Sequence, residues 1–465
     1  MAEEVKELQG IDWRRTFAFL EILRTFRMAA GPIRIGLCFL GLAASIGVGV
    51  LVDQVPGIGQ TNVRVPAVNP LEYRLATLGL DAGARTGFYD NVRYVLTKGL
   101  WGQWSIPYVD GKTWGDFSAF VAAPVTAAWD AVALAVAYWQ QARWFALVTT
   151  ILVLAIWAFV GTAVARMTAV RVARDESVPL GQALRFSCRK WPSAATCVLI
   201  PFGVLVLVGV LAYAPAGAVL AIPYAGEFLM GLALPLSLAM GLVLAMVFVG
   251  GVFSVGLQWP TIAAEGTDTF DAISRSVSYI TSRPWRYIFY TLFAAAYGCL
   301  TFVLVKFLVF LTLRITHVGI SIFWSVFTLG KGGPENKLVR LWDTPTLADP
   351  WRIASGAEQF YAEATAQHLY AFWIWIVMGL MAAFLISFFF TSQTVIYFLL
   401  RKIVDATDME EVYTEESEEE ELPLERKAET PEIMKVEPPP APPKAEDKPP
   451  TPPTAGQPPT SGRKP

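Results

Sequence analysis

Long apolar runs, separated by polar segments, dominate the first 404 residues of the chain. Each run has roughly 19 to 32 residues, and about 20 residues of α-helix cross a hydrocarbon core about 30 Å thick. The pattern therefore predicts an all-α fold, a polytopic membrane helix bundle with about six transmembrane helices. The six runs cover residues 33–52, 144–165, 195–213, 228–257, 287–311 and 369–400.

The distribution of lysine and arginine predicts how these helices are oriented. Basic residues cluster before the first run, between the second and third, between the fourth and fifth, and directly after the sixth. The short segment between the third and fourth runs has none. Because basic residues accumulate on the cytoplasmic side, we expect a multi-pass protein of a bacterial inner (plasma) membrane with both termini in the cytoplasm. Residues 53–143 and 312–368 would then form outer loops.

A further stretch, residues 119–139, is rich in alanine and valine and offers an alternative count. A span here would move the N-terminus outside, against its arginines, and the stretch contains Pro124 and Asp130. We therefore expect a helix that lies on the outer surface and leads into the second span. The first thirty residues mix acidic and basic side chains, and no small-residue cleavage site follows the first run, so that run is expected to be a signal anchor.

Residues 1–31 are predicted to hold an amphipathic helix at the cytoplasmic interface. Apolar positions between residues 11 and 30 follow a loosely helical period with arginines between them, which is typical of helices that lie in the plane of a membrane surface. Gly31-Pro32 is expected to end this helix before the first span.

The segments after the second and fourth spans resemble each other. In both, six residues separate a glutamate from the pair Ala-Leu or Ala-Ile, and two further residues separate that pair from a serine. The order span, interfacial helix, span thus occurs twice, over residues 144–213 and 228–311, which indicates an internal repeat. The matched positions are Glu176 and Glu265, Ala183 and Ala272, and Ser187 and Ser276.

A third copy of this repeat is an open alternative. It would consist of the sixth span, the N-terminal interfacial helix and the first span, in that order. If it is real, six helices form three pairs around an axis normal to the membrane. Parallel repeats of this kind occur in transporters, and they also arise where duplication has built a stable bundle without transport.

The last part of the chain, residues 405–465, has a different composition. Residues 408–421 contain nine acidic side chains, and residues 422–465 contain fourteen prolines. Such a segment buries too little apolar surface to offset the entropy of ordering it. We therefore expect a disordered cytoplasmic tail that is first acidic and then proline-rich.

The composition excludes several functions. Hydrophobic residues make up 54% of the chain and charged residues 16%, and the formal net charge is −2; no basic surface for nucleic acid is expected. The four cysteines, Cys38, Cys188, Cys197 and Cys299, form no CxxC pair, and there are two histidines, so no metal or other cofactor is expected. No span carries Asp, Glu, Arg or His near its middle, although proton relays and ion pumps need such groups. We expect a protein that is not an enzyme.

Basic residues beside the spans are candidates for contact with membrane lipids. Positive side chains near the interface attract anionic headgroups. Lysine in the fifth span is expected near the outer surface, where it either snorkels or serves as the counter-ion of a headgroup. The candidate headgroup contacts are Arg185, Arg189, Lys190, Arg275, Arg283, Arg286 and Lys306.

Hydroxyl groups along the sixth span are a second candidate site. Ser387, Thr391 and Thr394 are spaced by four and three residues and share one helical face. They would line a polar path, or they would bond to the backbone and to neighbouring helices, as such residues more often do.

The repeated Glu-x6-Ala-[Leu/Ile]-x-x-Ser element resembles a group of bacterial polytopic proteins that includes the membrane domain attached to some glycerophosphodiester phosphodiesterases. The resemblance covers about residues 144–311. It implies a helical membrane module; the soluble phosphodiesterase barrel is absent from this chain, so its activity is not implied.

The sequence is compatible with two functions. The first is a scaffold or accessory subunit whose tail, residues 405–465, recruits a cytoplasmic protein partner. The second is a transporter or lipid-handling protein with a cavity between the repeat pairs. A cavity lined by Ser387 and Thr391 would favour transport, and a densely packed axis would favour a scaffold.

Overall fold

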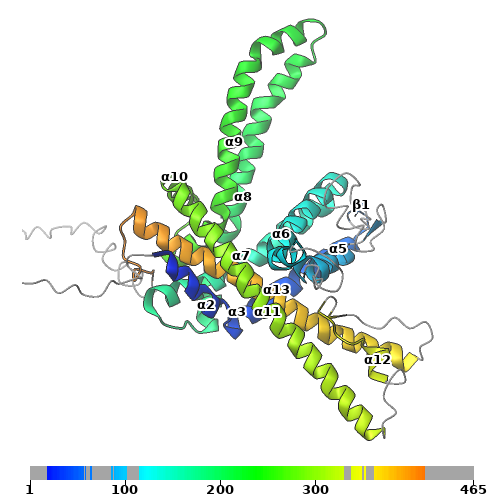
Figure 1. The fold of residues 1–465 in the computed structure, drawn as a ribbon. Helices are drawn as coiled ribbons and strands as arrows, with labels where there is room; N and C mark the ends of the chain where they lie inside the picture. Colours follow the sequence, from blue (N-terminus) through cyan, green and yellow to red (C-terminus); the bar gives the residue numbers. More distant parts are fainter. Residues whose placement is uncertain are drawn as a thin grey trace, which may run out of the picture. The chain divides into compact units, whose positions relative to one another are not determined.

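The structure is a computed structural model, and nearly all of its secondary structure is helical (Figure 1). A two-residue antiparallel pair, β1 (Val63–Arg64) with β2 (Arg85–Thr86), is the exception within the described part of the chain. The described residues are 18–56, 58, 63–64, 85–86, 88–101, 115–328, 337–347, 350–351 and 361–413. Most of the predicted tail, residues 414–465, lies outside them and forms a unit separate from residues 1–413.

Seven helices in the described residues are long and apolar enough to cross a membrane. The chain is therefore a polytopic α-helical membrane protein. All six predicted runs lie within these helices. The additional candidate is α6, which contains the stretch that the sequence pattern placed on the outer surface. The helices are α3 (Pro32–Asp53), α6 (Gly115–Gln141), α7 (Arg143–Arg174), α8 (Leu180–Leu220), α9 (Ala225–Glu265), α11 (Pro284–Phe327) and α13 (Tyr361–Val404).

Four of these helices are longer than a membrane requires. α8 and α9 have 41 residues each, and α11 and α13 have 44. At about 1.5 Å per residue they reach roughly 60 Å, about twice the thickness of a hydrocarbon core. The predicted spans are thus the central parts of longer helices that extend beyond the membrane or tilt within it.

The chain enters the bundle through two short helical segments, η1 (Ala18–Arg24) and α2 (Thr25–Ala29). They form the described part of the predicted N-terminal amphipathic helix; residues 11–17 lie outside the described residues. Gly31 is extended, with φ −60° and ψ 128°, and Pro32 is the first residue of α3. Proline suits the first position of a helix because the N–H that it lacks would have no partner there. The predicted break at Gly31-Pro32 is therefore confirmed.

The two copies of the repeat differ where their interfacial helices meet the next span. In the second copy, α10 (Thr269–Ser282) is a separate helix, and α11 begins after Arg283 with Pro284 at its first position. The first copy has no separate helix: the predicted interfacial segment forms the first turns of α8, which continues through Pro192. An interior proline removes one backbone hydrogen bond, a loss that packed membrane helices tolerate.

Both copies nevertheless bury the same matched side chains. Ala183 and Ala272 are fully buried, and so are Ser187 and Ser276. The Ser187 hydroxyl donates to the carbonyl oxygen of Phe159 in α7, and the Ser276 hydroxyl donates to the backbone of α10 itself. Small residues at these positions allow helices to approach closely, which explains why the pattern keeps them small.

The end of α13 lies at the centre of the packing. Every residue from 395 to 400 is buried, and α13 contacts α3, α7, α9 and α11. Gly161 in α7 allows one of these approaches, because a Cβ there would lie 2.7 Å from the Trp259 ring and 2.9 Å from the Phe390 ring. This part of the bundle is densely packed.

α8 and α9 lie side by side as a hairpin (Figure 1). Apolar side chains are exposed along much of its length. The side chains of Leu211, Leu232 and Leu236 are all more than 60% exposed. A helix that is apolar on all faces needs an apolar surrounding. The exposed apolar surface of this hairpin is of the kind found on helices that cross a membrane.

Short elements occupy the predicted outer loops. The buried residues Trp101, Trp342 and Trp351 belong to one apolar cluster together with α11 and α13. These elements are α5 (Phe88–Tyr94), the π-helical segment η2 (Val95–Gly99) and α12 (Lys337–Leu341).

Candidate functional site

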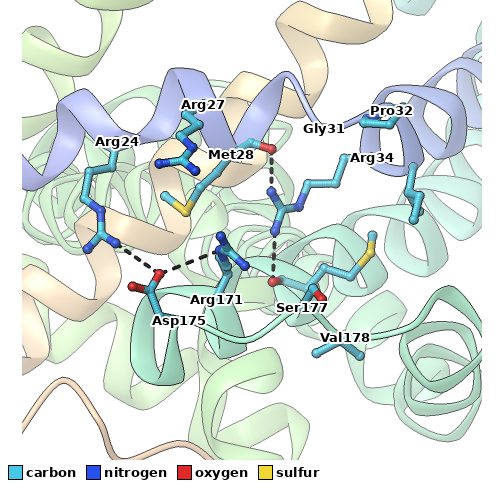
Figure 2. Close-up of a pocket in the computed structure, with 12 residues that line it drawn as sticks. Arg24, Arg27, Met28, Gly31, Pro32, Arg34, Arg171, Asp175, Ser177 and Val178 are labelled. Atoms are coloured by element: carbon cyan, nitrogen blue, oxygen red, sulfur yellow. Dashed lines mark hydrogen bonds and ion pairs between the residues drawn. The ribbon is translucent and has the colours of Figure 1, made fainter.

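We define the basic end of the bundle as the end at which α3 and α11 begin and at which α7, α9 and α13 end. A pocket of about 610 Å³ opens there (Figure 2). Its walls are η1, α2, the first turn of α3, the last turns of α7 and the loop after α7. Four arginines line it and define the arginine pocket: Arg24, Arg27, Arg34 and Arg171.

One acidic side chain, Asp175, holds two of these arginines together. Its Oδ1 lies 3.2 Å from Nη2 of Arg24 and 3.7 Å from Nε of Arg171 (Figure 2). Asp175 caps the C-terminus of α7 with φ 57°, a left-handed conformation that aspartate tolerates better than most residues. The turn out of α7 therefore places a carboxylate between the two guanidinium groups.

The other two arginines have no carboxylate partner among the described residues. Arg34 donates to the carbonyl oxygens of Met28 and Met167, the second at 3.0 Å. Its Nε is buried without a hydrogen-bond partner. Arg27 is exposed and forms no ion pair or hydrogen bond with the described part of the chain. The pocket thus keeps positive charge that no described residue neutralises.

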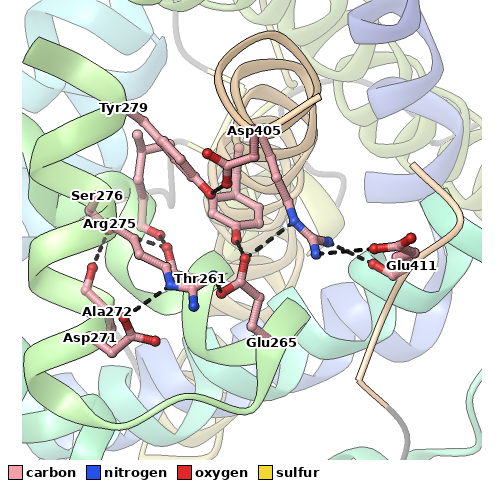
Figure 3. A network of polar contacts seen from close by, with 12 residues as sticks. Thr261, Glu265, Asp271, Ala272, Arg275, Ser276, Tyr279, Asp405 and Glu411 are labelled. Carbon is pink, nitrogen blue, oxygen red and sulfur yellow. Dashed lines mark hydrogen bonds and ion pairs between the residues drawn. The ribbon is translucent and has the colours of Figure 1, made fainter. Parts of the chain in front are cut away.

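A second cluster at the basic end is built around Glu265 (Figure 3). This carboxylate is only 7% exposed and forms ion pairs with Arg275 of α10 and, at 3.2 Å, with Arg401 of α13. The hydroxyl of Tyr397 donates to it as well. Glu265 is the last residue of α9, where the helix dipole opposes a negative charge. The two arginines offset both that dipole and the burial.

α10 supplies much of this glutamate cluster. Burial by itself would lower the pKa of Arg275, but its hydrogen bond to Asp271 and the charges of Glu265 and Asp271 raise the pKa overall. Tyr279 donates to Asp405, and burial, followed by this hydrogen bond, raises the pKa of the Tyr279 phenol. Arg275 therefore stays charged and Tyr279 stays a neutral donor at any physiological pH.

The chain after α13 is fastened to the same end of the bundle. The backbone N–H of Tyr413 donates to the carbonyl of Ala264 at 2.9 Å, and the carbonyl of Tyr413 accepts from Arg166 at 2.8 Å. Arg189 donates to the Tyr413 hydroxyl at 2.7 Å. Residues 405–413 were predicted to belong to a disordered tail; the structure instead docks them on the bundle, because backbone and hydroxyl groups of their last residue find partners.

Two residues support this docking: Gly266 leaves space for the Tyr413 ring, and Arg166 binds the Tyr413 carbonyl. Gly266 has φ +66°, and a Cβ there would lie 2.9 Å from the Tyr413 ring. Arg166 is 6% exposed, donates to the carbonyl of Ala263 at 2.9 Å and lies 4.7 Å from the centre of the Phe186 ring. Arg166 was not among the predicted site residues, although an arginine at the edge of an apolar run is a recognisable signal of a specific partner.

The residues predicted to contact lipid headgroups lie in different environments in the structure. Lys190 lies 4.0 Å from Asp268, Arg275 belongs to the glutamate cluster, and Arg189 bonds to Tyr413. Three remain exposed with no ion pair or hydrogen bond to a described residue: Arg185, Arg283 and Arg286.

Lys306 does not reach the surface and does not fit the prediction of a snorkelling side chain. It is fully buried, and its Nζ donates to the carbonyl oxygens of Trp101 at 2.7 Å and Phe120 at 2.8 Å. The Phe120 carbonyl would ordinarily accept from residue 124, but Pro124 has no N–H to give. Lys306 replaces that missing donor and also lies 4.2 Å from the centre of the Phe120 ring.

The predicted polar path is a packed face in this structure. Ser387 donates to the carbonyl of Ala29 at 2.9 Å, and Thr394 donates to the carbonyl of Phe390 within α13. The Thr391 hydroxyl is buried without a partner. All three side chains are fully buried, and none lines the pockets described at the basic end or between the helices.

Within the described residues, no group of three or more His, Cys, Asp or Glu side chains is arranged to hold a metal ion. Glu176, the sequence match of Glu265, is exposed. Comparisons of the chain with models of protein families, with curated proteins and with solved structures found no match.

Proposed function

We propose that this protein is a non-enzymatic scaffold or accessory subunit of a bacterial inner membrane, which presents residues 414–465 to a cytoplasmic protein partner. The observation that carries the proposal is the docking of Tyr413. Its partners come from three helices: α7 through Arg166, α8 through Arg189 and α9 through Ala264. The bundle therefore holds in place the residue, Tyr413, that directly precedes the acidic and proline-rich sequence.

The packing around α13 supports the same proposal. A transport path along the sixth span would need Ser387 and Thr391 beside a cavity, whereas both are fully buried. A rigid bundle with a fastened exit suits a protein that holds a partner near the membrane. The orientation required, with the basic end in the cytoplasm, follows from the distribution of arginine and lysine.

The test compares the full chain with two variants in the same cells. One variant ends at residue 413, and the other carries residues 414–465 in scrambled order, so that charge and proline content are kept. Proteins crosslinked to each are identified by quantitative mass spectrometry. We expect a cytoplasmic protein that the full chain enriches at least tenfold over both variants. Resistance of all three to alkaline extraction from membranes controls for insertion.

Equal recovery of the same proteins by the full chain and the truncated chain would refute recruitment by the tail. Recovery by the scrambled tail would show that composition alone, without a defined motif, attracts the partner, and it would refute a specific scaffold.

A groove between α6, α11 and α13 supports the alternative of lipid handling. It measures about 430 Å³ and is lined almost entirely by apolar side chains, with Ser392 and Gln393 at one side. The Gln393 Oε1 is buried without a hydrogen-bond partner. Vesicles that contain the purified protein and a headgroup-labelled lipid test this alternative: lipid handling predicts faster exchange between leaflets than in protein-free vesicles, and an equal rate excludes it.

A further inference from the structure

The arginine pocket holds more positive than negative charge. Its lining contains four arginines and one acidic residue, Asp175, which gives a formal charge of +3. Glu21 pairs with Arg24 at 3.1 Å from outside the lining and lowers the local balance to +2. Arg27 has no partner among the described residues, and Arg34 is held by carbonyl oxygens, which leave its charge in place. Like charges so close together need an anion to offset their repulsion.

Backbone groups add to this attraction. The first turn of α3 lines the pocket. Pro32 has no N–H and the N–H of Ile35 donates to Gly31, so the N–H groups of Ile33 and Arg34 are the ones in this turn that have no acceptor within the helix. Proline at the first position and the extended Gly31 leave no side-chain cap there. The positive end of the helix dipole therefore points into the region that the arginines occupy.

The walls of the pocket are apolar as well as charged. Met28, Ile33, Met167 and Val178 line it beside the arginines, and Ile33 is 50% exposed. α3 continues from this first turn as a candidate membrane span. A ligand with a phosphate among the arginines and hydrocarbon along Ile33 would satisfy both kinds of surface.

We infer that the arginine pocket binds the headgroup of an anionic phospholipid. The phosphate accepts hydrogen bonds from Arg27 and Arg171, since planar guanidinium groups match phosphate oxygens. The acyl chains follow α3 into the membrane. Basic pockets between membrane helices bind anionic headgroups in this way, and the volume of about 610 Å³ lies in the usual range of ligand pockets.

The test uses the purified full chain, with lipid retained in detergent measured by native mass spectrometry. Phosphatidylglycerol is the anionic probe and phosphatidylcholine the zwitterionic one. The variant is Arg27→Gln with Arg171→Gln, because the first residue has no described partner and the second only an ion pair at 3.7 Å. The matched control is Arg174→Gln with Lys402→Gln, which removes two exposed basic side chains elsewhere at the basic end that form no ion pair or hydrogen bond with a described residue.

We expect the unaltered chain to prefer phosphatidylglycerol at least tenfold. The pocket variant should lose about thirtyfold in affinity, since each arginine at an anionic surface contributes about a factor of five, while the control variant should stay within twofold. Equal losses in the two variants, or none in the pocket variant, would overturn the site. If the double variant fails to fold, Arg27→Gln alone tests the site. We expect it to lose about fivefold in affinity for phosphatidylglycerol, and no loss would overturn the site.

The same chemistry also fits a free phosphate ester, so a second arm separates the two sources. Glycerol phosphate carries the headgroup charge without acyl chains. We expect it to displace phosphatidylglycerol only at concentrations at least a hundredfold higher than the lipid. Equal potency would show that the pocket binds a soluble phosphate ester, and this result would overturn the lipid assignment.

Discussion

The two charged clusters at the basic end are made from the same residue types but have opposite balances. In the glutamate cluster, Glu265 is buried between Arg275 and Arg401, and further acids surround the arginines. In the arginine pocket, one carboxylate, Asp175, serves two arginines and two more have none among the described residues. A balanced cluster, in which every arginine is paired with a carboxylate, holds helices together, whereas a cluster with unpaired arginines leaves attraction for a ligand. The charge pairing in the folded chain thus distinguishes a cluster with a structural role from a cluster that is suited to binding a ligand, although both contain the same residue types.

The strongest test of this comparison removes the charge at the centre of the balanced cluster. Glu265→Gln leaves Arg275 and Arg401 without their shared carboxylate, and breaking a buried ion pair costs about 3 kcal/mol; the value is at the low end because Arg275 is 43% exposed. The free energy of unfolding in detergent measures the loss. Glu176→Gln is the control, since the matched glutamate is exposed, and it should change stability by less than about 0.5 kcal/mol. Similar losses at both positions would contradict the distinction.

Lys306 extends the comparison to a buried cation whose hydrogen-bond partners, two backbone carbonyl oxygens, carry no formal charge. Lys306→Met removes the hydrogen bonds that Nζ donates to the carbonyl oxygens of Trp101 and Phe120, and each buried hydrogen bond that is lost costs about 1 kcal/mol or more. We expect a loss of about 2 kcal/mol in the free energy of unfolding. Adding Pro124→Ala restores a backbone N–H for Phe120 and should recover about half of that loss. A double-mutant cycle measures this coupling, and strict additivity would argue against a replaced donor.

The smallest expected effect concerns the docking of the chain after α13. Gly266→Ala places a methyl group in the left-handed region and against the Tyr413 ring, at a cost of about 1 kcal/mol. Hydrogen–deuterium exchange should rise in residues 405–413 and change little in α7. Gly181→Ala is the control, because a Cβ there meets nothing within 4 Å. Unchanged exchange in residues 405–413 would show that Tyr413 does not fasten the segment through Gly266.

Local sequence patterns predict the helices of this protein better than they predict its sites. Apolar runs identified all six expected spans, and Gly31-Pro32 marked the start of α3, because run length and proline chemistry act locally. The extra candidate α6 was assigned to the surface, since Pro124 and Asp130 argue against a span when the helix is considered alone. The donor that compensates Pro124, Lys306, comes from another helix.

The sites depend on partners that no local pattern contains. Glu176 and Glu265 match in sequence, yet one is exposed and the other buried. Glu265 is covered by Tyr397 and Arg401, which lie more than 130 residues further along the chain. The arginine pocket likewise joins η1 and α3 to the end of α7. The sequence predicts that these charges gather on one side of the membrane, but it does not indicate which of them form pairs.

The hydrogen bonds of Lys306 have a consequence for the order in which the chain is made. Lys306 follows Phe120 by 186 residues and Trp101 by 205, so ribosomes working at about 5–20 residues per second produce it roughly 10 to 40 seconds after both carbonyl groups have emerged. During that interval the hydrogen bonds that Lys306 donates to Trp101 and Phe120 cannot form. The contact between α6 and α11 is thus completed late in translation, whichever parts of the basic end have already assembled.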